Sequence, residues 1–266
     1  MGIAIAALVV LLCANQVTIA QPLTFNANVV GGPFSNAIAE LYTPPGAGPF
    51  PAVVVLHGCN GVGPHYRSWA RQLAQWGYIA LLVDSFRPRN FTEVCNRGML
   101  VPPRLQAQDA FNAADYLRSR IDVRPEKIAV IGFSHGGWAV LKAVLAGLVR
   151  PPQTRPFAAA VAFYPGCDPP ASALETDTLI LIGEADEWTP MERCARWRDL
   201  VQPNGHVVRL KSYPGALHGF DAPGAPHYFA GHFVGRDPAA AADALAETRA
   251  FLDSHLSPLR ASLRGE

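Results

Sequence analysis

Short apolar runs alternate with stretches of helical periodicity along most of the chain. The runs are nearly continuous in hydrophobic residues, as strands buried on both faces are; they read PAVVVLHG, YIALLVD, KIAVIGF, AAAVAFY and DTLILIG. Between them, apolar positions recur with helical spacing at 68–75, at 105–120 and from Trp138 to Leu148. This alternation predicts an α/β fold with a mostly parallel sheet covered by helices on both faces, and active groups at the carboxyl ends of its strands.

The chain before residue 50 has a different pattern. Residues 23–30 and 38–42 predict a hairpin-like pair of strands, and a turn rich in proline and glycine follows them. Residues 3–12 are apolar throughout, and Ala20 and its neighbours supply the small residues that a signal peptidase requires. We therefore expect residues 1–20 to be a signal peptide, the protein to be exported to a periplasm or secreted, and residues 21–266 to form one domain.

The apolar N-terminal run leaves two alternatives open. No lysine or arginine precedes it, so an uncleaved or anchored segment is one of them, although the run is short for a membrane span. Leu11-Leu12-Cys13 suggests a lipoprotein cleavage site as the other, but Leu12 is bulkier than the residue usual before such a cysteine. After cleavage we expect no stable membrane association.

Composition and charge narrow the class of protein. At 266 residues, with 50% hydrophobic and 16% charged residues, the chain is long enough to bury one large core. The formal net charge of +1 comes from interspersed acidic and basic residues. A basic face for nucleic acid or for an anionic membrane surface is therefore not expected.

The sharpest change of pattern along the chain falls at Ser134. An apolar run precedes it, helical spacing follows it, and Gly132 and Gly136 flank it two positions away on either side. A strand-to-helix corner brings two backbone segments close together, which favours glycine at both positions, and lifts the serine hydroxyl beside a helix N-terminus. We predict that Ser134 is a nucleophile; a tight turn in which it only caps the helix is the alternative.

A serine nucleophile needs a histidine base and a carboxylate that orients the histidine. Asp186 follows the strand TLILIG, and His218 follows the last strand-like run, VVRLKSY. Ser134, Asp186, His218 is the chain order in which such a sheet supplies nucleophile, acid and base to one edge. Glu184 and Glu187 are rivals for the acid, but we favour Asp186 because its side chain is expected to point over the sheet edge.

The negative charge that develops during acyl transfer needs hydrogen-bond donors. The backbone N–H of His135, directly after the nucleophile, is one predicted donor. Cys59, in the loop after VVVLHG, supplies the other predicted N–H, while His57 and Gly58 are expected to shape that loop.

Removal of residues 1–20 would leave four cysteines, an even number that permits two disulfides in an exported protein. Three pairings are possible. We favour Cys59 with Cys95 and Cys167 with Cys194, because each pair follows strand ends that neighbouring strands bring together. Buried free thiols are the alternative, and the spacing matches no zinc motif.

Around these residues the sequence resembles the dienelactone hydrolase family of α/β hydrolases. The resemblance runs from about Ala52 to Leu252 and implies the α/β-hydrolase fold. The founding members carry a cysteine where Ser134 stands and a glutamate where Gly58 stands. The segments that carry the resemblance are VVVLHGCNGVGPHYRSWARQLAQWGYIALLVDSF, IAVIGFSHGG, LIGEADEWTP and LHGFD.

The resemblance implies a serine hydrolase that cleaves small carboxylic esters, and lactones as a variant, through an acyl-enzyme without a metal or an organic cofactor. Arg87 and Arg89 are expected to supply part of a substrate clamp, and Trp188 to border the pocket together with the loop at 85–103. A serine peptidase of the same fold and a non-catalytic binding protein remain alternatives, and the sequence leaves the oligomeric state open.

Overall fold

A central sheet of eight strands organises the chain. The computed structural model describes residues 21–26 and 36–257, so the predicted signal peptide lies outside the described residues. The strand order is β1-β2-β4-β3-β5-β6-β7-β8, parallel from β4 to β8 and antiparallel at β1 and β2. The strands are β1 Gln21–Asn26, β2 Asn36–Tyr42, β3 Phe50–Leu56, β4 Ile79–Asp84, β5 Val123–Phe133, β6 Ala160–Phe163, β7 Thr178–Gly183 and β8 Val208–Tyr213.

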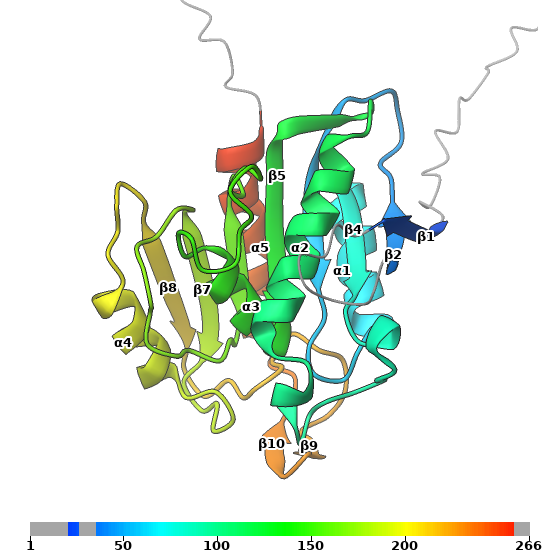
Figure 1. The fold of residues 1–266 in the computed structure, drawn as a ribbon. Helices are drawn as coiled ribbons and strands as arrows, with labels where there is room; N and C mark the ends of the chain where they lie inside the picture. Colours follow the sequence, from blue (N-terminus) through cyan, green and yellow to red (C-terminus); the bar gives the residue numbers. More distant parts are fainter. Residues whose placement is uncertain (1–20, 27–35, 258–266) are drawn as a thin grey trace, which may run out of the picture.

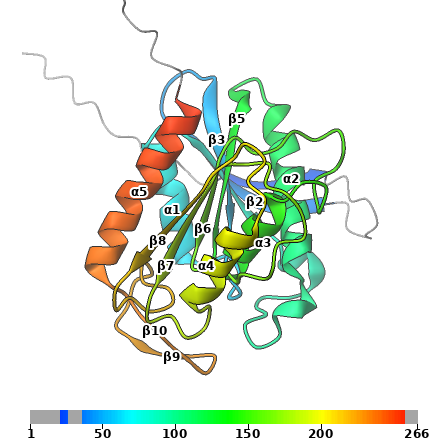
Figure 2. The same ribbon diagram turned by 90° about the vertical axis from the view of Figure 1, so that its left-hand side faces the viewer.

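Helices cover both faces of the sheet, as the alternating pattern predicts. Figure 2 shows α1 and α5 on one face and α2 and α3 on the other. In the described part of the chain no helix has the length and hydrophobicity needed to cross a membrane. The helices are α1 Pro64–Gln75, α2 Pro103–Arg118, α3 His135–Ala143, α4 Met191–Leu200 and α5 Pro238–Leu256.

The core lies between these layers. Every residue of β4, β6 and β7 is buried, because strands covered on both faces have no solvent side. A second, smaller cluster of buried residues lies under the loop after β4 and contains Cys59, Phe86, Val94 and Val101. The loop at 85–103 is therefore packed against the body of the protein.

The helix after Ser134 is shorter than its periodicity predicts. It ends at Ala143, whereas the apolar spacing continues to Leu148. The carbonyl oxygen of Val144 accepts a hydrogen bond from the Glu175 N–H, and Gly147 has a left-handed φ of +69°. Pairing with a distant segment thus replaces the next helical turn, and Leu148 is left exposed.

A short hairpin, β9 His227–Phe229 with β10 His232–Val234, lies near the end of the molecule at which α2 begins and β5, β7 and β8 end (Figure 1). The sequence pattern does not predict this hairpin. Its three-residue strands are too short to show alternation. The hairpin is tied to the sheet region by an isolated bridge between Val234 and His218.

Candidate active site

Ser134 stands at the corner between β5 and α3 in a strained backbone conformation. Its φ of +52° and ψ of −112° lie in a region that residues with a side chain rarely adopt. A Cβ on Gly132 would lie 2.2 Å from the carbonyl oxygen of Gly136, and one on Gly136 would lie 2.5 Å from that of Leu56. Both glycines are therefore required by the close approach of β3, β5 and α3, as the sequence predicts.

His218 and Asp186 lie beside Ser134 in a continuous chain of hydrogen bonds. The Nε2 atom of His218 is 2.9 Å from the Ser134 Oγ, and its Nδ1 atom is 2.8 Å from Asp186 Oδ2. An ionised carboxylate only accepts hydrogen bonds, so Nδ1 carries the proton and Nε2 is free to accept one from the serine. His218 and Asp186 are both buried.

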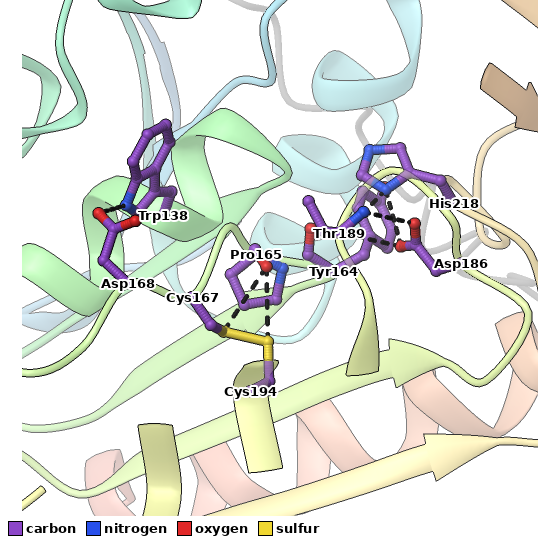
Figure 3. The surroundings of a disulfide bond; sticks show 9 residues. All are labelled: Trp138, Tyr164, Pro165, Cys167, Asp168, Asp186, Thr189, Cys194 and His218. Carbon is purple, nitrogen blue, oxygen red and sulfur yellow. Dashed lines mark hydrogen bonds and ion pairs between the residues drawn. A yellow bond between two sulfur atoms is a disulfide. The ribbon is translucent and has the colours of Figure 1, made fainter. Parts of the chain in front are cut away.

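The carboxylate of Asp186 is held by the residues that follow it. Its Oδ1 accepts hydrogen bonds from the N–H groups of Trp188 (2.9 Å) and Thr189 (2.8 Å), and its Oδ2 accepts one from the Thr189 hydroxyl (2.8 Å). Figure 3 shows the hydrogen bonds from Thr189 to Asp186 as dashed lines. Glu184 and Glu187, the rivals for the acid, are exposed, and Glu184 accepts a hydrogen bond from the Ser212 hydroxyl instead.

The two predicted oxyanion donors both border a cavity beside Ser134. His135 is the first residue of α3, where N–H groups have no partner within the helix, and Cys59 lies three positions after β3. Cys59, His135 and Ser134 line one common cavity. The structure thus brings both segments next to Ser134.

A buried glutamine joins these two segments. The side-chain amide of Gln106 donates a hydrogen bond to the carbonyl oxygen of His57 (2.9 Å), and its Oε1 lies 2.8 Å from Nδ1 of His135. Gln106 is fully buried in α2. The sequence does not single out Gln106, because an isolated glutamine within a helix gives no signal of its role.

His57 shapes the loop from a fully buried position. Its Nε2 accepts a hydrogen bond from the Ser85 N–H (3.1 Å), so its Nδ1 carries the proton and donates to the carbonyl oxygen of Gly58 (2.7 Å). Burial lowers the pKa of His57 to about 4, and burial also lowers the pKa of His135. The His57 imidazole is therefore neutral at pH 7.

A second buried carboxylate, that of Asp221, lies next to the candidate site. Asp221 accepts hydrogen bonds from the Tyr164 hydroxyl (2.7 Å) and the Trp69 ring N–H (2.8 Å), and it lies 3.2 Å from His65 Nε2. Burial alone would raise the pKa of Asp221, but the attraction of His65 and these hydrogen bonds hold it below its ordinary value. The Tyr164 ring lies 4.7 Å from that of His218, centroid to centroid. Tyr164 follows β6 directly, so the strand-end rule used for Asp186 would have found it.

Two cavities meet at Ser134. One, of about 350 Å³, is lined by His218, Tyr164, Trp188 and Phe229 among others. The other, of about 260 Å³, is lined by His135, Trp138, Gly166 and Trp188 among others. Trp188 therefore borders both cavities.

Arg87 and Arg89 do not line either of these cavities, in contrast to the prediction of a substrate clamp. Arg89 forms a bidentate ion pair with Asp109 in α2 (2.8 and 2.9 Å), and Arg87 lies 3.2 Å from Asp84. Asp109 lies in α2 and Asp84 ends β4, so carboxylates of the protein itself neutralise both arginines. We assign them a structural role in fastening the loop.

The four cysteines form the pairs favoured from the sequence. Disulfides join Cys59 to Cys95 and Cys167 to Cys194, and Figure 3 shows the second one next to Pro165. Cys59, Cys95 and Cys167 line the smaller cavity. Within the described ranges no group of histidine, cysteine, aspartate or glutamate side chains is suited to hold a metal ion.

Comparison with known proteins agrees with this architecture. A protein from Bradyrhizobium sp., named "Probable 2-oxo-3-(5-oxofuran-2-ylidene)propanoate lactonase", is 26% identical over 210 residues, which cover 72% of this chain and 82% of that protein. A dienelactone hydrolase-like promiscuous phosphotriesterase from metagenomic libraries has a similar structure, with a TM-score of 0.70, 22% identity and coverage of 90% of this chain and 99% of its own. A propionate-bound esterase from Thermogutta terrifontis also has a similar structure, with a TM-score of 0.64 and 18% identity. The match covers 92% of this chain and 98% of the esterase.

The solved structures, at these identities, establish the fold. The family is established by the sequence, because the model of the dienelactone hydrolase family matches residues 38–256, which run from within β2 to the end of α5. The chain belongs to the dienelactone hydrolase family, and its fold is that of the α/β hydrolases.

Proposed function

We propose that the protein is a serine hydrolase that cleaves carboxylic esters, and lactones as cyclic esters, through an acyl-enzyme. The observation that carries the proposal is the hydrogen-bonded chain from Ser134 Oγ through His218 to Asp186 at the corner between β5 and α3. A serine hydroxyl is a weak nucleophile until an adjacent imidazole takes its proton, and this geometry supplies that imidazole in the required tautomer.

In the first half of the reaction, Ser134 Oγ attacks the carbonyl carbon of the ester while His218 Nε2 takes the hydroxyl proton. Asp186 stabilises the imidazolium that forms, because its Oδ2 already accepts the Nδ1–H hydrogen bond. The N–H groups of Cys59 and His135 face the developing oxyanion. The imidazolium then gives its proton to the leaving alcohol oxygen, and the acyl group remains on Ser134.

In the second half, water replaces the alcohol. His218 takes a proton from the water, the resulting hydroxide attacks the acyl carbon, and Ser134 leaves with the proton that His218 returns. The products are a carboxylic acid and an alcohol, with no net change at the enzyme. No step requires a metal or an organic cofactor.

Two further observations support the proposal. A relative that matches 72% of the chain is named a lactonase, and a lactone is a cyclic ester. Both disulfides are of the kind that persists in oxidising compartments, which supports export to a periplasm or secretion. We propose a small-molecule ester as the substrate.

The test is the hydrolysis of p-nitrophenyl acetate by the wild type and by Ser134→Ala. The substitution removes one small group, so the variant should fold normally by circular dichroism and lose essentially all activity. Ser68→Ala, at an exposed position of α1, is the matched control and should keep full activity. Retention of more than a few per cent of the activity by Ser134→Ala would overturn the nucleophile assignment, and a wild type without activity would favour a binding protein.

A further inference from the structure

The two cavities at Ser134 differ in their relation to the proposed base. The larger one, called here the His218 cavity, is lined by His218 together with Tyr66, Tyr164, Phe229 and Val234. The smaller one, called here the Trp138 cavity, is lined by His135, Trp138, Gly98 and Gly166, and His218 is not among its lining residues. Both include Ser134, so an ester bound at Ser134 extends into both.

The position of the base decides which part of the ester each cavity takes. The leaving oxygen must receive its proton from His218 Nε2, which is the atom 2.9 Å from Ser134 Oγ. That oxygen therefore lies on the His218 side, and its substituent continues into the cavity that His218 lines. The acyl substituent points the other way, past His135, whose N–H is a proposed oxyanion donor.

The walls of the His218 cavity indicate the kind of alcohol it takes. Aromatic rings surround it: Trp188 lies 4.8 Å from the His218 ring and 6.0 Å from the Phe229 ring, and Tyr164 lies 4.7 Å from His218, centroid to centroid. The Tyr66 hydroxyl is already bonded to Asn60 Oδ1 (2.6 Å), and the Tyr164 hydroxyl to Asp221. These rings thus present faces and edges rather than free polar groups, which suits an apolar, flat substituent.

The Trp138 cavity is smaller, at about 260 Å³ against about 350 Å³. Its inner wall is held in place, since the Trp138 ring N–H donates to Asp168 Oδ2 (2.7 Å) and a Cβ on Gly166 would lie only 3.0 Å from the Trp138 ring. The disulfide of Cys59 and Cys95 closes another side. A rigid wall of this kind favours a short acyl group.

We propose that the enzyme prefers esters of aromatic or arylmethyl alcohols with short acyl groups, the alcohol part binding in the His218 cavity and the acyl part in the Trp138 cavity. This inference rests on the proposed function, because the direction of the ester follows from the role of His218 as proton donor to the leaving oxygen.

Two isomeric esters test the direction. Benzyl acetate carries its ring on the alcohol side, and methyl phenylacetate carries the same ring on the acyl side, so the proposed binding direction places the ring of each ester in a different cavity. Acid release in a pH-stat measures kcat/KM for both. The wild type should hydrolyse benzyl acetate faster by about tenfold or more, a ratio typical of one well-fitted apolar group.

Two variants, each of which fills one cavity, separate the fit of an ester in that cavity from its intrinsic reactivity. The reason is that kcat/KM for each ester is compared between the variant and the wild type. Ala222→Phe places a ring in the His218 cavity, and Gly98→Leu places a side chain in the Trp138 cavity, where a Cβ would meet His135 at an ordinary 3.6 Å. Ala222→Phe should lower kcat/KM mainly for benzyl acetate, and Gly98→Leu mainly for methyl phenylacetate. Ile121→Ala, at a position that is 98% exposed, should change neither.

The outcomes distinguish this inference from the proposed function. If Ala222→Phe impairs methyl phenylacetate more than benzyl acetate, or if both filling variants impair both esters equally, the direction of binding is wrong. A wild type that cleaves p-nitrophenyl acetate but neither isomer, or that prefers methyl phenylacetate, also overturns the inference. If no ester is cleaved at all, the proposed function itself fails.

Discussion

Asp186 Oδ2 lies 2.8 Å from His218 Nδ1, and the two residues come from loops after different strands, β7 and β8. The same carboxylate is held by two backbone N–H groups and by the Thr189 hydroxyl. Its orientation is therefore fixed before substrate binds, which is the condition for holding an imidazole in one tautomer.

Asp186→Asn should lower kcat by about four orders of magnitude, as the loss of an orienting carboxylate does in comparable triads. The asparagine retains the shape of the side chain but no longer selects the Nδ1–H tautomer. Steady-state kinetics on p-nitrophenyl acetate measure the effect. Glu184→Gln and Glu187→Gln, both at exposed positions, are the matched controls and should cost far less; a larger effect from either would identify a different acid.

Gln106→Leu should lower kcat by about tenfold to a hundredfold with little change in KM, because Gln106 positions the segments that carry both proposed oxyanion donors. The leucine leaves the His57 carbonyl oxygen and the His135 ring N–H buried without these partners. Gln75→Leu, at the exposed end of α1, is the control. A loss of thermal stability with an unchanged kcat in the folded fraction would show that Gln106 is only structural.

The two disulfides should differ in their effect on activity. The double variant Cys59→Ser/Cys95→Ser should lower both the melting temperature and kcat, since Cys59 carries a proposed oxyanion donor and its carbonyl oxygen also binds the Val94 N–H (2.8 Å). The double variant Cys167→Ser/Cys194→Ser should mainly lower stability, and each bridge typically contributes about 2–4 kcal/mol.

Mass spectrometry of non-reduced peptides checks the pairing. Alkylation of all four thiols without reduction, in protein purified from an oxidising compartment, would contradict both the bridges and the expectation of export.

Acidification below neutrality should destabilise the fold through His57. Its pKa falls from an ordinary 6.5 to about 4 on burial, so the unfolded chain binds a proton there between these pH values and the folded chain does not. The free energy of unfolding should therefore be highest above pH 6.5 and should fall toward pH 4 by about 3 kcal/mol from this group. His135, whose pKa burial also lowers, adds to the loss in the same direction.

Urea unfolding at a series of pH values measures this dependence. His57→Asn, which cannot take up the proton, should flatten the curve even if it lowers the overall stability. A wild type whose free energy of unfolding is constant between pH 7 and pH 4.5 would contradict the account of His57.

Much of the architecture followed from local patterns. The continuous apolar strands predicted a covered parallel sheet, and the rule that parallel strands end at one edge was enough to select Ser134, Asp186 and His218. The same rule, applied to the end of β6, would also have selected Tyr164.

The features that escaped prediction depend on contacts between distant segments. Arg87 and Arg89 looked like free cations in a loop, but Asp109 neutralises Arg89 from a helix whose placement no local pattern specifies. Gln106 is buried among polar groups of the site, whereas the helical spacing around it does not show whether its side chain faces the core or the solvent. The β9–β10 hairpin supplies Phe229 and Val234 to the His218 cavity through strands too short to recognise.

Ser134 is the proposed covalent nucleophile, and every other proposed role at the site depends on this assignment. Treatment with a fluorophosphonate, followed by intact-mass and peptide mass spectrometry, tests it most directly, because the reagent forms a stable adduct with an activated serine. We predict one adduct per chain on the peptide that contains Ser134, loss of esterase activity in parallel with labelling, and no adduct on Ser134→Ala. An active protein that is labelled elsewhere, or that is not labelled at all, would contradict the account.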